Sequence, residues 1–191
     1  MDRAEDLRKE IPPVLRVGVT GHRSLENADM LTRDVRKVLG RIREIAVSHG
    51  GVLPVIELVS PIAEGTDRLV AREILNDPTA RLRVPLPFPK EDYMNDFESA
   101  GSKKEFEDLL DRAYKVEVLP TASTRDEGYE QVGIYVLDNC DVLIAIWDGK
   151  SSRGRGGTAE VVAGARERGL PLFWIHADEP GVITEELGGG F

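Results

Sequence analysis

The chain of 191 residues contains one cysteine, Cys140, and only three histidines. A lone cysteine cannot form an intramolecular disulfide, and no group of cysteines and histidines has the spacing of a zinc site. We therefore predict no metal and no disulfide, and we expect Cys140 to be a small buried residue. The same cysteine usage points to the reducing cytoplasm.

Long apolar runs and an excess of basic residues are missing too. No stretch approaches the roughly 20 apolar residues of a membrane span, and the charged residues 1–10 lack the apolar core of a secretory signal. The 25 Lys and Arg stand against 34 Asp and Glu, a formal net charge of −9. Membrane and nucleic-acid partners are therefore disfavoured. A small anionic ligand is not, because helix N-termini and single arginines hold phosphate.

Short apolar runs alternate with segments of helical periodicity. The runs predict strands at residues 14–20, 53–59, 82–86, 116–119, 142–147 and 172–175. Apolar residues at helical spacing predict helices at 29–49, 66–75, 103–114, 126–137 and 158–168. This alternation predicts an α/β fold in which helices cover both faces of a mostly parallel sheet.

We interpret residues 1–176 as one domain. The irregular segment 87–102 carries Phe88, Tyr93 and Phe97, and with the helix after it to residue 114 it reads as an insertion over the sheet edge. Its aromatic residues serve either as a lid over a ligand or as an anchor. Residues 177–191 are acidic, carry three consecutive glycines and are expected to form a flexible tail.

Three loops follow predicted strands, where ligands of open α/β sheets bind. In the first loop, Gly21 lets the backbone approach a phosphate and Arg23 supplies positive charge. His22 either touches the ligand or pins the loop. An ordinary strand-to-helix turn is the alternative for this loop.

The second loop leads through Glu64 and Gly65 into a helix whose first residues are Thr66 and Asp67. Free N–H groups at that helix start favour an anion. Thr66 as an N-cap and Asp67 in the first turn would also explain a helix start that binds nothing. Glu64 is not needed for capping, and either Glu64 or Glu160 is predicted to accept hydrogen bonds from ribose hydroxyls.

The third loop, with Gly156, Gly157, Thr158 and Glu160, carries the strongest prediction of a phosphate site. Glycines between a buried strand and a helix form an anion cradle, and Thr158 either caps the helix or binds phosphate. With Thr158 as N-cap, Glu160 lies one residue before the capping-box position. A flexible turn is the alternative. The chain has no Walker A loop and no Gly-x-Gly-x-x-Gly, so no cofactor is predicted.

These motifs occur in a characteristic order: Gly18-x-x-Gly-His-Arg23, Pro61-x-Ala-Glu-Gly-x-Asp67, Asp141 through Asp148-Gly149-Lys150, and Gly156-Gly-Thr-Ala-Glu160. Together they resemble the SLOG superfamily, the group of DNA-processing protein A and the Lonely Guy enzymes, from Val14 to Ile175. The resemblance implies a Rossmann-like three-layer αβα sandwich, a nucleotide-like small molecule as ligand, and a homodimer or higher homo-oligomer.

Two functions follow from the resemblance. One is binding or sensing of a phosphate-bearing nucleotide derivative; the other is an N-glycosidase or phosphoribohydrolase that acts on nucleoside monophosphates, with Glu160 as the catalytic carboxylate. The hydrolases carry Gly-Gly-x-Gly-Thr-x-x-Glu, and Glu160 comes one residue early, about 100° around a helix. The preceding helix offers no arginine either. We therefore expect binding. DNA binding lacks the basic, aromatic groove that it needs.

Overall fold

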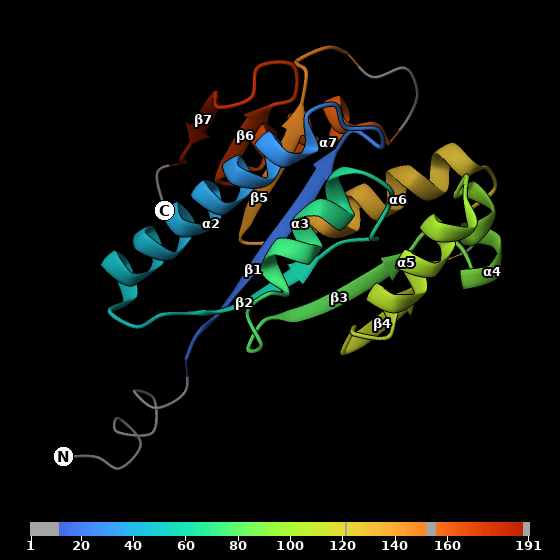
Figure 1. Cartoon of the computed structure of the whole chain (residues 1–191), viewed down its shortest axis with the longest axis horizontal. Coiled ribbons are helices and arrows are strands. Elements are labelled where there is room, and N and C mark those ends of the chain that lie inside the picture. Colours follow the sequence, from blue (N-terminus) through green and yellow to red (C-terminus); the bar gives the residue numbers. More distant parts are fainter. Residues whose placement is uncertain (1–11, 121, 152–155, 189–191) are drawn as a thin grey trace.

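The computed structural model describes residues 12–120, 122–151 and 156–188 (Figure 1). The strands are β1 (Val14–Gly21), β2 (Val55–Val59), β3 (Arg81–Leu86), β4 (Lys115–Val118), β5 (Val142–Trp147), β6 (Leu172–His176) and β7 (Ile183–Glu186). The helices are α2 (Ala28–Gly50), α3 (Thr66–Ile74), α4 (Lys90–Tyr93), α5 (Ala100–Leu110), α6 (Arg125–Asp138) and α7 (Thr158–Glu167), with a 3₁₀ turn, η1 (Met94–Asp96).

The seven strands form one sheet in the order β4-β3-β2-β1-β5-β6-β7. Every neighbouring pair in this order is parallel except β6 with β7. The chain builds β2, β3 and β4 outward on one side of β1, and then returns to place β5 on the other side. The predicted α/β fold with a mostly parallel sheet is confirmed, and it is Rossmann-like.

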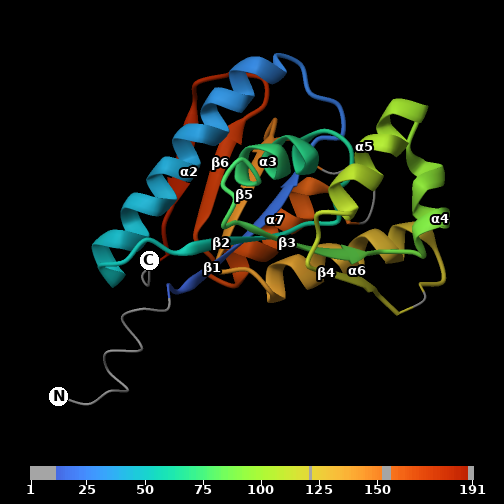
Figure 2. The ribbon, with the colours of Figure 1, turned by 60° about the horizontal axis from the view of Figure 1, so that its bottom comes forward.

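Helices cover both faces of the sheet (Figure 2). Side chains alternate between the faces of a strand, so Val17 and Val19 join the larger apolar cluster under α2, α3 and α5. Val59, Leu143 and Ala145 face the smaller cluster under α6 and α7. Together these layers form the three-layer sandwich that the sequence resemblance implies.

Gly18 of β1 explains why α6 lies so close to the sheet. A Cβ at this position would come within 2.8 Å of the Cys140 sulfur and 2.9 Å of Val136. Cys140 is buried against it, and burial raises the pKa of its thiol to about 12. The prediction that Cys140 is a small buried residue is confirmed.

The predicted insertion belongs to the regular winding of the chain. Its helix α5 is the crossover that joins the parallel strands β3 and β4, and such strands need a connection of a dozen or more residues. The helix begins at Ala100 rather than at 103, because the Ser99 hydroxyl caps it by accepting from the Ser102 amide (3.0 Å). It ends at Leu110, before the predicted 114.

The prediction of a flexible tail from residue 177 is wrong for its described part. Ile183–Glu186 forms β7, antiparallel to β6, and Ile183 packs against the larger apolar cluster. Its acidic residues pair across the sheet edge: Glu185 with Arg41 (3.2 Å) and Glu186 with Arg166 (2.7 Å). The segment looks loose in sequence because these partners are far away along the chain.

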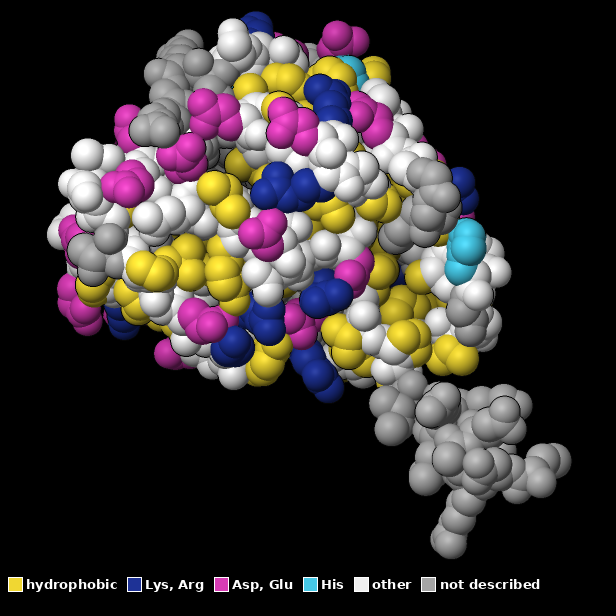
Figure 3. All heavy atoms as spheres, turned by 180° about the vertical axis from the view of Figure 1, so that it is seen from behind, with side chains coloured by type: hydrophobic (Ala, Val, Ile, Leu, Met, Phe, Trp, Pro, Cys, Tyr) yellow, Lys and Arg dark blue, Asp and Glu magenta, His cyan; other side chains and the backbone are white. Residues whose placement is uncertain are grey.

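The surface carries both signs of charge. Figure 3 shows the α6 and α7 side, where Lys and Arg alternate with Asp and Glu between small apolar areas. No continuous basic stripe crosses this face. None of the helices within the described ranges combines the length and the apolar character that crossing a bilayer requires.

The role of β7 can be tested with a pair of substitutions. Ile183→Ala should lower the free energy of unfolding by about 1–2 kcal/mol, roughly half the cost at a fully buried isoleucine. Val182→Ala is the control, because Val182 is 42% exposed and should change stability by less than about 0.5 kcal/mol. Urea denaturation measures both, and equal small effects would contradict a structural role for β7.

Candidate functional site

The candidate site lies where the strand order reverses. β1 pairs with β2 on one side and with β5 on the other. From the carboxyl end of β1 the chain continues toward β2, and from the carboxyl end of β5 it continues toward β6, in the opposite direction along the sheet. Ligands of open α/β sheets bind in the crevice at such a point. Here a pocket of about 920 Å³ opens, near the upper end of the roughly 300–1,000 Å³ typical of small-molecule sites.

The structure brings most of the predicted site residues together around this pocket. Its lining includes Gly21, His22, Arg23, Asp67, Gly156, Gly157 and Thr158. The other four predicted residues, Glu64, Gly65, Thr66 and Glu160, are not among the described residues that line it. The contacts of each group explain the difference.

His22 pins the first loop to the end of β5. The Asp148 amide donates to Nε2 of His22 (3.2 Å), and the Asp148 carboxylate lies 3.3 Å from the same nitrogen. Of the two roles predicted for His22, the structure therefore contains the pinning one. Arg23 is exposed, and its guanidinium lies over the Tyr129 ring of α6, 4.8 Å from the centroid. A cation in this position is held at the pocket wall by the aromatic ring.

Gly65 and Thr66 support the first loop from behind. The Thr66 amide and hydroxyl both donate to the His22 carbonyl oxygen, at 3.0 and 3.1 Å. Gly65 has a φ of 78°, and a Cβ there would overlap the carbonyl oxygens of His22 and Arg23. Gly65, not Thr66, occupies the N-cap position, without a side-chain cap. The alternative in which Thr66 is the N-cap is therefore wrong.

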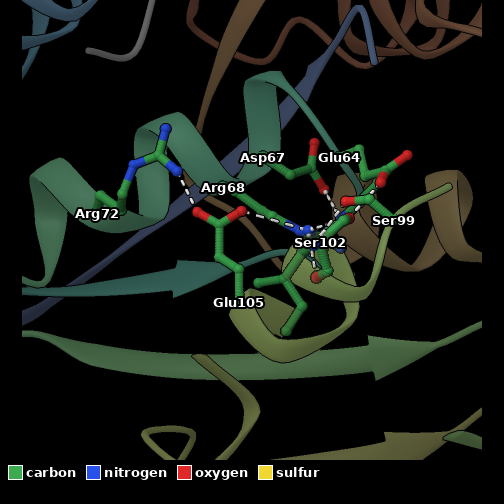
Figure 4. A network of polar contacts seen from close by, with 9 residues as sticks. Glu64, Asp67, Arg68, Arg72, Ser99, Ser102 and Glu105 are labelled. Atoms are coloured by element: carbon green, nitrogen blue, oxygen red, sulfur yellow. Dashed lines mark hydrogen bonds and ion pairs between the residues drawn. The ribbon is translucent and has the colours of Figure 1, made fainter. Parts of the chain in front are cut away.

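Glu64 is turned toward α5 (Figure 4). Its carboxylate accepts a hydrogen bond from the Ser102 hydroxyl. The Ser102 hydroxyl also accepts a hydrogen bond from the guanidinium of Arg68, which is 2% exposed. Arg68 donates to the Ile62 carbonyl as well (3.0 Å). Glu105 forms ion pairs with both Arg68 and Arg72. This network fastens α5 to α3. The ribose contact of Glu64 stays a prediction, and these contacts do not favour it.

Asp67 is a buried carboxyl group in the lining of the pocket, 5% exposed. It accepts hydrogen bonds from the Ser60 hydroxyl (2.8 Å) and the Ala63 amide (3.3 Å). Burial raises the pKa of Asp67 to about 6, against the opposing effect of these hydrogen bonds and of Arg23 and Arg68. A strongly shifted pKa inside a pocket is typical of functional groups.

The third loop turns the start of α7 toward the pocket. Gly157 is the N-cap residue and makes no side-chain cap, so Glu160 occupies the third helical position. From there the Glu160 carboxylate reaches back to accept from the Gly156 amide (2.6 Å). The third helical position is that of a capping-box glutamate, so the expectation that Glu160 lies one residue early is wrong because the N-cap is Gly157 and not Thr158. Its hydrogen bond differs from a capping box, however, because it reaches the residue before the N-cap and not the N-cap itself.

The backbone of the third loop lies close to α6. Gly156 has a φ of 74°, and a Cβ there would lie 2.6 Å from the Tyr129 carbonyl carbon. Thr158 and Ala159, the next residues of α7, line the pocket. The first N–H groups of a helix have no carbonyl partner within the helix, so these amides are available to an anion in the pocket.

Sequence reasoning did not include Tyr129, Asp148 and Lys150 among the site residues, although they line the pocket. Tyr93, which the sequence suggested as part of either a lid or an anchor, lines the pocket as a buried residue. Asp148-Gly149-Lys150 belongs to the family-like motif set and could have been included on that ground. Tyr129 carries no signal, because a tyrosine in a predicted helix is ordinary. Among the described residues, no three His, Cys, Asp or Glu side chains come together as a metal site.

The shifted pKa of Asp67 predicts a pH-dependent stability. Between pH 3.8 and about 6, folded Asp67 holds a proton that the unfolded chain has released. Its contribution to stability therefore falls as the pH rises through this window and stays low above it. The comparison is the free energy of unfolding of Asp67→Asn minus that of the wild type, measured at two pH values. We expect this difference to be about 2 kcal/mol more positive at about pH 7.5 than at about pH 4.5.

Asp77→Asn is the matched control. The pKa of Asp77 is lowered, chiefly by hydrogen bonds from Thr79, so Asp77 is ionised in both states throughout this pH range. The effect of Asp77→Asn should be equal at the two pH values. Urea denaturation of the three proteins at both pH values makes the comparison, and a pH-independent effect of Asp67→Asn would show that Asp67 titrates normally.

Comparisons with known proteins add no family to this picture. No model of a known protein family matches the chain, and no curated protein matches it significantly. The likeness to the SLOG superfamily therefore rests on the four ordered motifs alone, and all four contribute residues to one pocket.

Proposed function

We propose that this protein binds a phosphate-bearing nucleotide or nucleotide derivative in the pocket between β1, β5 and α7. The phosphate would lie at the start of α7, between Gly157 and the first loop. The Thr158 amide and hydroxyl would donate to its oxygens, and Arg23 would supply the positive charge. As in the sequence resemblance, we propose a homo-oligomer that serves as a ligand-binding or sensing unit.

One observation carries the proposal. The N-terminus of α7 and the Arg23 side chain border the same pocket, although they come from opposite ends of the chain. Unpaired amides and the positive end of a helix dipole attract an anion, and arginine binds phosphate through a planar fork of donors. Their convergence supports a phosphate site within an acidic protein.

The contacts of Glu160 favour binding over hydrolysis. A glycosidase needs a carboxylate held against the sugar carbon where positive charge develops. The Glu160 carboxylate is engaged with the Gly156 amide and does not belong to the described lining of the pocket. Four carboxyl groups belong to the described lining, those of Glu26, Asp67, Asp148 and Asp178. Asp67 is the buried one, and it already accepts two hydrogen bonds, from Ser60 and Ala63.

A thermal-shift panel tests the proposal. Nucleoside mono-, di- and cyclic phosphates and NAD derivatives are added in excess, and the melting temperature is recorded. A ligand at 100 times its Kd should stabilise the fold by about 2.7 kcal/mol, which raises the melting temperature by roughly 5–10 °C in a protein of this size. No shift with any member of the panel would overturn the proposed function.

Arg23→Gln should weaken binding of the active nucleotide by roughly 10- to 100-fold, because a hydrogen bond to a charged group contributes about 1.5–3 kcal/mol. Arg125→Gln is the control. Arg125 pairs with Asp92 and Asp96 and is not among the lining residues, so its loss should leave affinity unchanged. Calorimetric titration compares the two, and native mass spectrometry of the same samples gives the number of subunits.

The hydrolytic alternative has its own readout. When the protein is incubated with each nucleoside monophosphate, chromatography should detect no release of free base. Release that disappears in Glu160→Gln would instead assign the N-glycosidase activity and contradict simple binding.

A further inference from the structure

Tyr93 of α4 is buried like a core residue but carries a hydroxyl group. Its ring is 0% exposed and packs edge-on against Phe97 and Phe106, with centroids 5.0 and 5.7 Å away. The apolar contacts explain the aromatic ring, and a phenylalanine would make them equally well. They give no reason for the hydroxyl group.

The Tyr93 hydroxyl has no hydrogen-bond partner among the residues that the structure describes. Buried polar groups nearly always have a partner, and an unsatisfied one destabilises the fold. The neighbouring Tyr129 follows this rule, since its hydroxyl donates to Asp96. An unpaired tyrosine hydroxyl in the wall of a pocket is therefore a group that a ligand can satisfy.

The surroundings of this hydroxyl are polar. Tyr93 lines the pocket together with Asp67, Arg23 and Tyr129. Burial raises the pKa of Tyr93 well above its ordinary value, the nearby Asp67 charge raises it further, and Arg23 lowers it. The hydroxyl thus lies within the influence of both charges.

Asp67 offers an acceptor in the lining of the same pocket. The Ser60 hydroxyl and the Ala63 amide both donate to Oδ2 of its carboxylate. A carboxylate has about four acceptor positions on its two oxygens, so further capacity remains. The buried part of the pocket lining therefore includes one donor, from Tyr93, and one acceptor, from Asp67.

We infer that the Tyr93 hydroxyl and the Asp67 carboxylate form a subsite for one sugar hydroxyl of the ligand; this inference rests on the proposed function. The sugar oxygen accepts from Tyr93, and its proton is donated to Asp67. A hydroxyl group is suited to this position because one oxygen both accepts and donates.

Other parts of a nucleotide fit less well. An ionised phosphate oxygen has no proton to donate and would meet Asp67, whose pKa of about 6 leaves it mostly charged at neutral pH. A base would need an open aromatic face for stacking, whereas the Tyr93 ring is fully buried. The segment between β3 and β4 would then contribute to sugar recognition, in addition to completing the crossover.

Tyr93→Phe tests the subsite. The probes are the 5′-monophosphates of adenosine, guanosine, cytidine and uridine, each with its 2′-deoxy and 2′,3′-dideoxy forms, measured by calorimetric titration. We expect the wild type to bind at least one ribonucleotide more than about tenfold more tightly than its dideoxy form, because the sugar hydroxyl makes two buried hydrogen bonds. Tyr93→Phe keeps Asp67 as an acceptor but loses the bond from Tyr93, so the preference should fall about tenfold.

Two controls separate this subsite from the phosphate site. Arg23→Gln should weaken every form equally and keep the preference for the sugar hydroxyl. Tyr114→Phe, which removes a hydroxyl bonded to Glu57 (2.9 Å) and outside the described pocket lining, should keep both affinity and preference.

The unliganded proteins provide a second measurement. Because the Tyr93 hydroxyl has no partner to lose, Tyr93→Phe should not lower the free energy of unfolding. A clear loss of stability would show that the hydroxyl is satisfied within the fold and would overturn the subsite. So would a wild type without sugar preference, or a Tyr93→Phe protein that retains the full preference, while the proposed function would stand. Failure of all these monophosphates to bind either protein would overturn the subsite, and the proposed function would fall with it only if the thermal-shift panel also gave no shift.

Discussion

Parallel pairing between β1 and β5 holds the whole site together. The pairing continues beyond the strand ends, where the His22 amide donates to the Ile146 carbonyl (3.2 Å) and the Asp148 amide donates to the His22 ring. After β1 the chain continues to β2 on one side, and after β5 it continues to β6 on the other. The two connections therefore diverge at this contact, and the start of α7 lies at the crevice between them. Among the parallel strand pairs of the described sheet, this is the pair at which the direction of winding reverses.

Some residues around this crevice line the pocket, and others hold the loops that form its wall. Gly65 and Thr66 belong to a motif that looks like a ligand loop, yet their contacts are with the backbone of His22 and Arg23. Glu160 likewise caps the turn that presents Gly156. Such contacts hold the loops in place, which would reduce the ordering cost of the binding that we propose. The motif residues outside the described pocket lining are thereby explained by the support they give to the loops.

Local fields, not net charge, determine what the pocket attracts. The chain carries a formal charge of −9, but many of its acidic residues form ion pairs, such as Glu186 with Arg166 and Asp141 with Arg16. Inside the pocket the helix start and Arg23 contribute positive potential, and low-dielectric walls strengthen it. Asp67, the one buried carboxyl group among the described lining residues, contributes negative potential to another part of the pocket.

The amino-acid sequence by itself determined the order of strands and helices, the parallel sheet and the loops at its carboxyl edge, because short-range periodicity and glycine positions encode these features locally. Which loop residues line the pocket was decided by the tertiary structure. Glu64 meets Ser102, Tyr93 arrives from the β3–β4 connection, and β7 pairs with β6. Each of these contacts joins segments that are far apart in the sequence and meet only in the folded sheet. A local sequence pattern therefore cannot predict them.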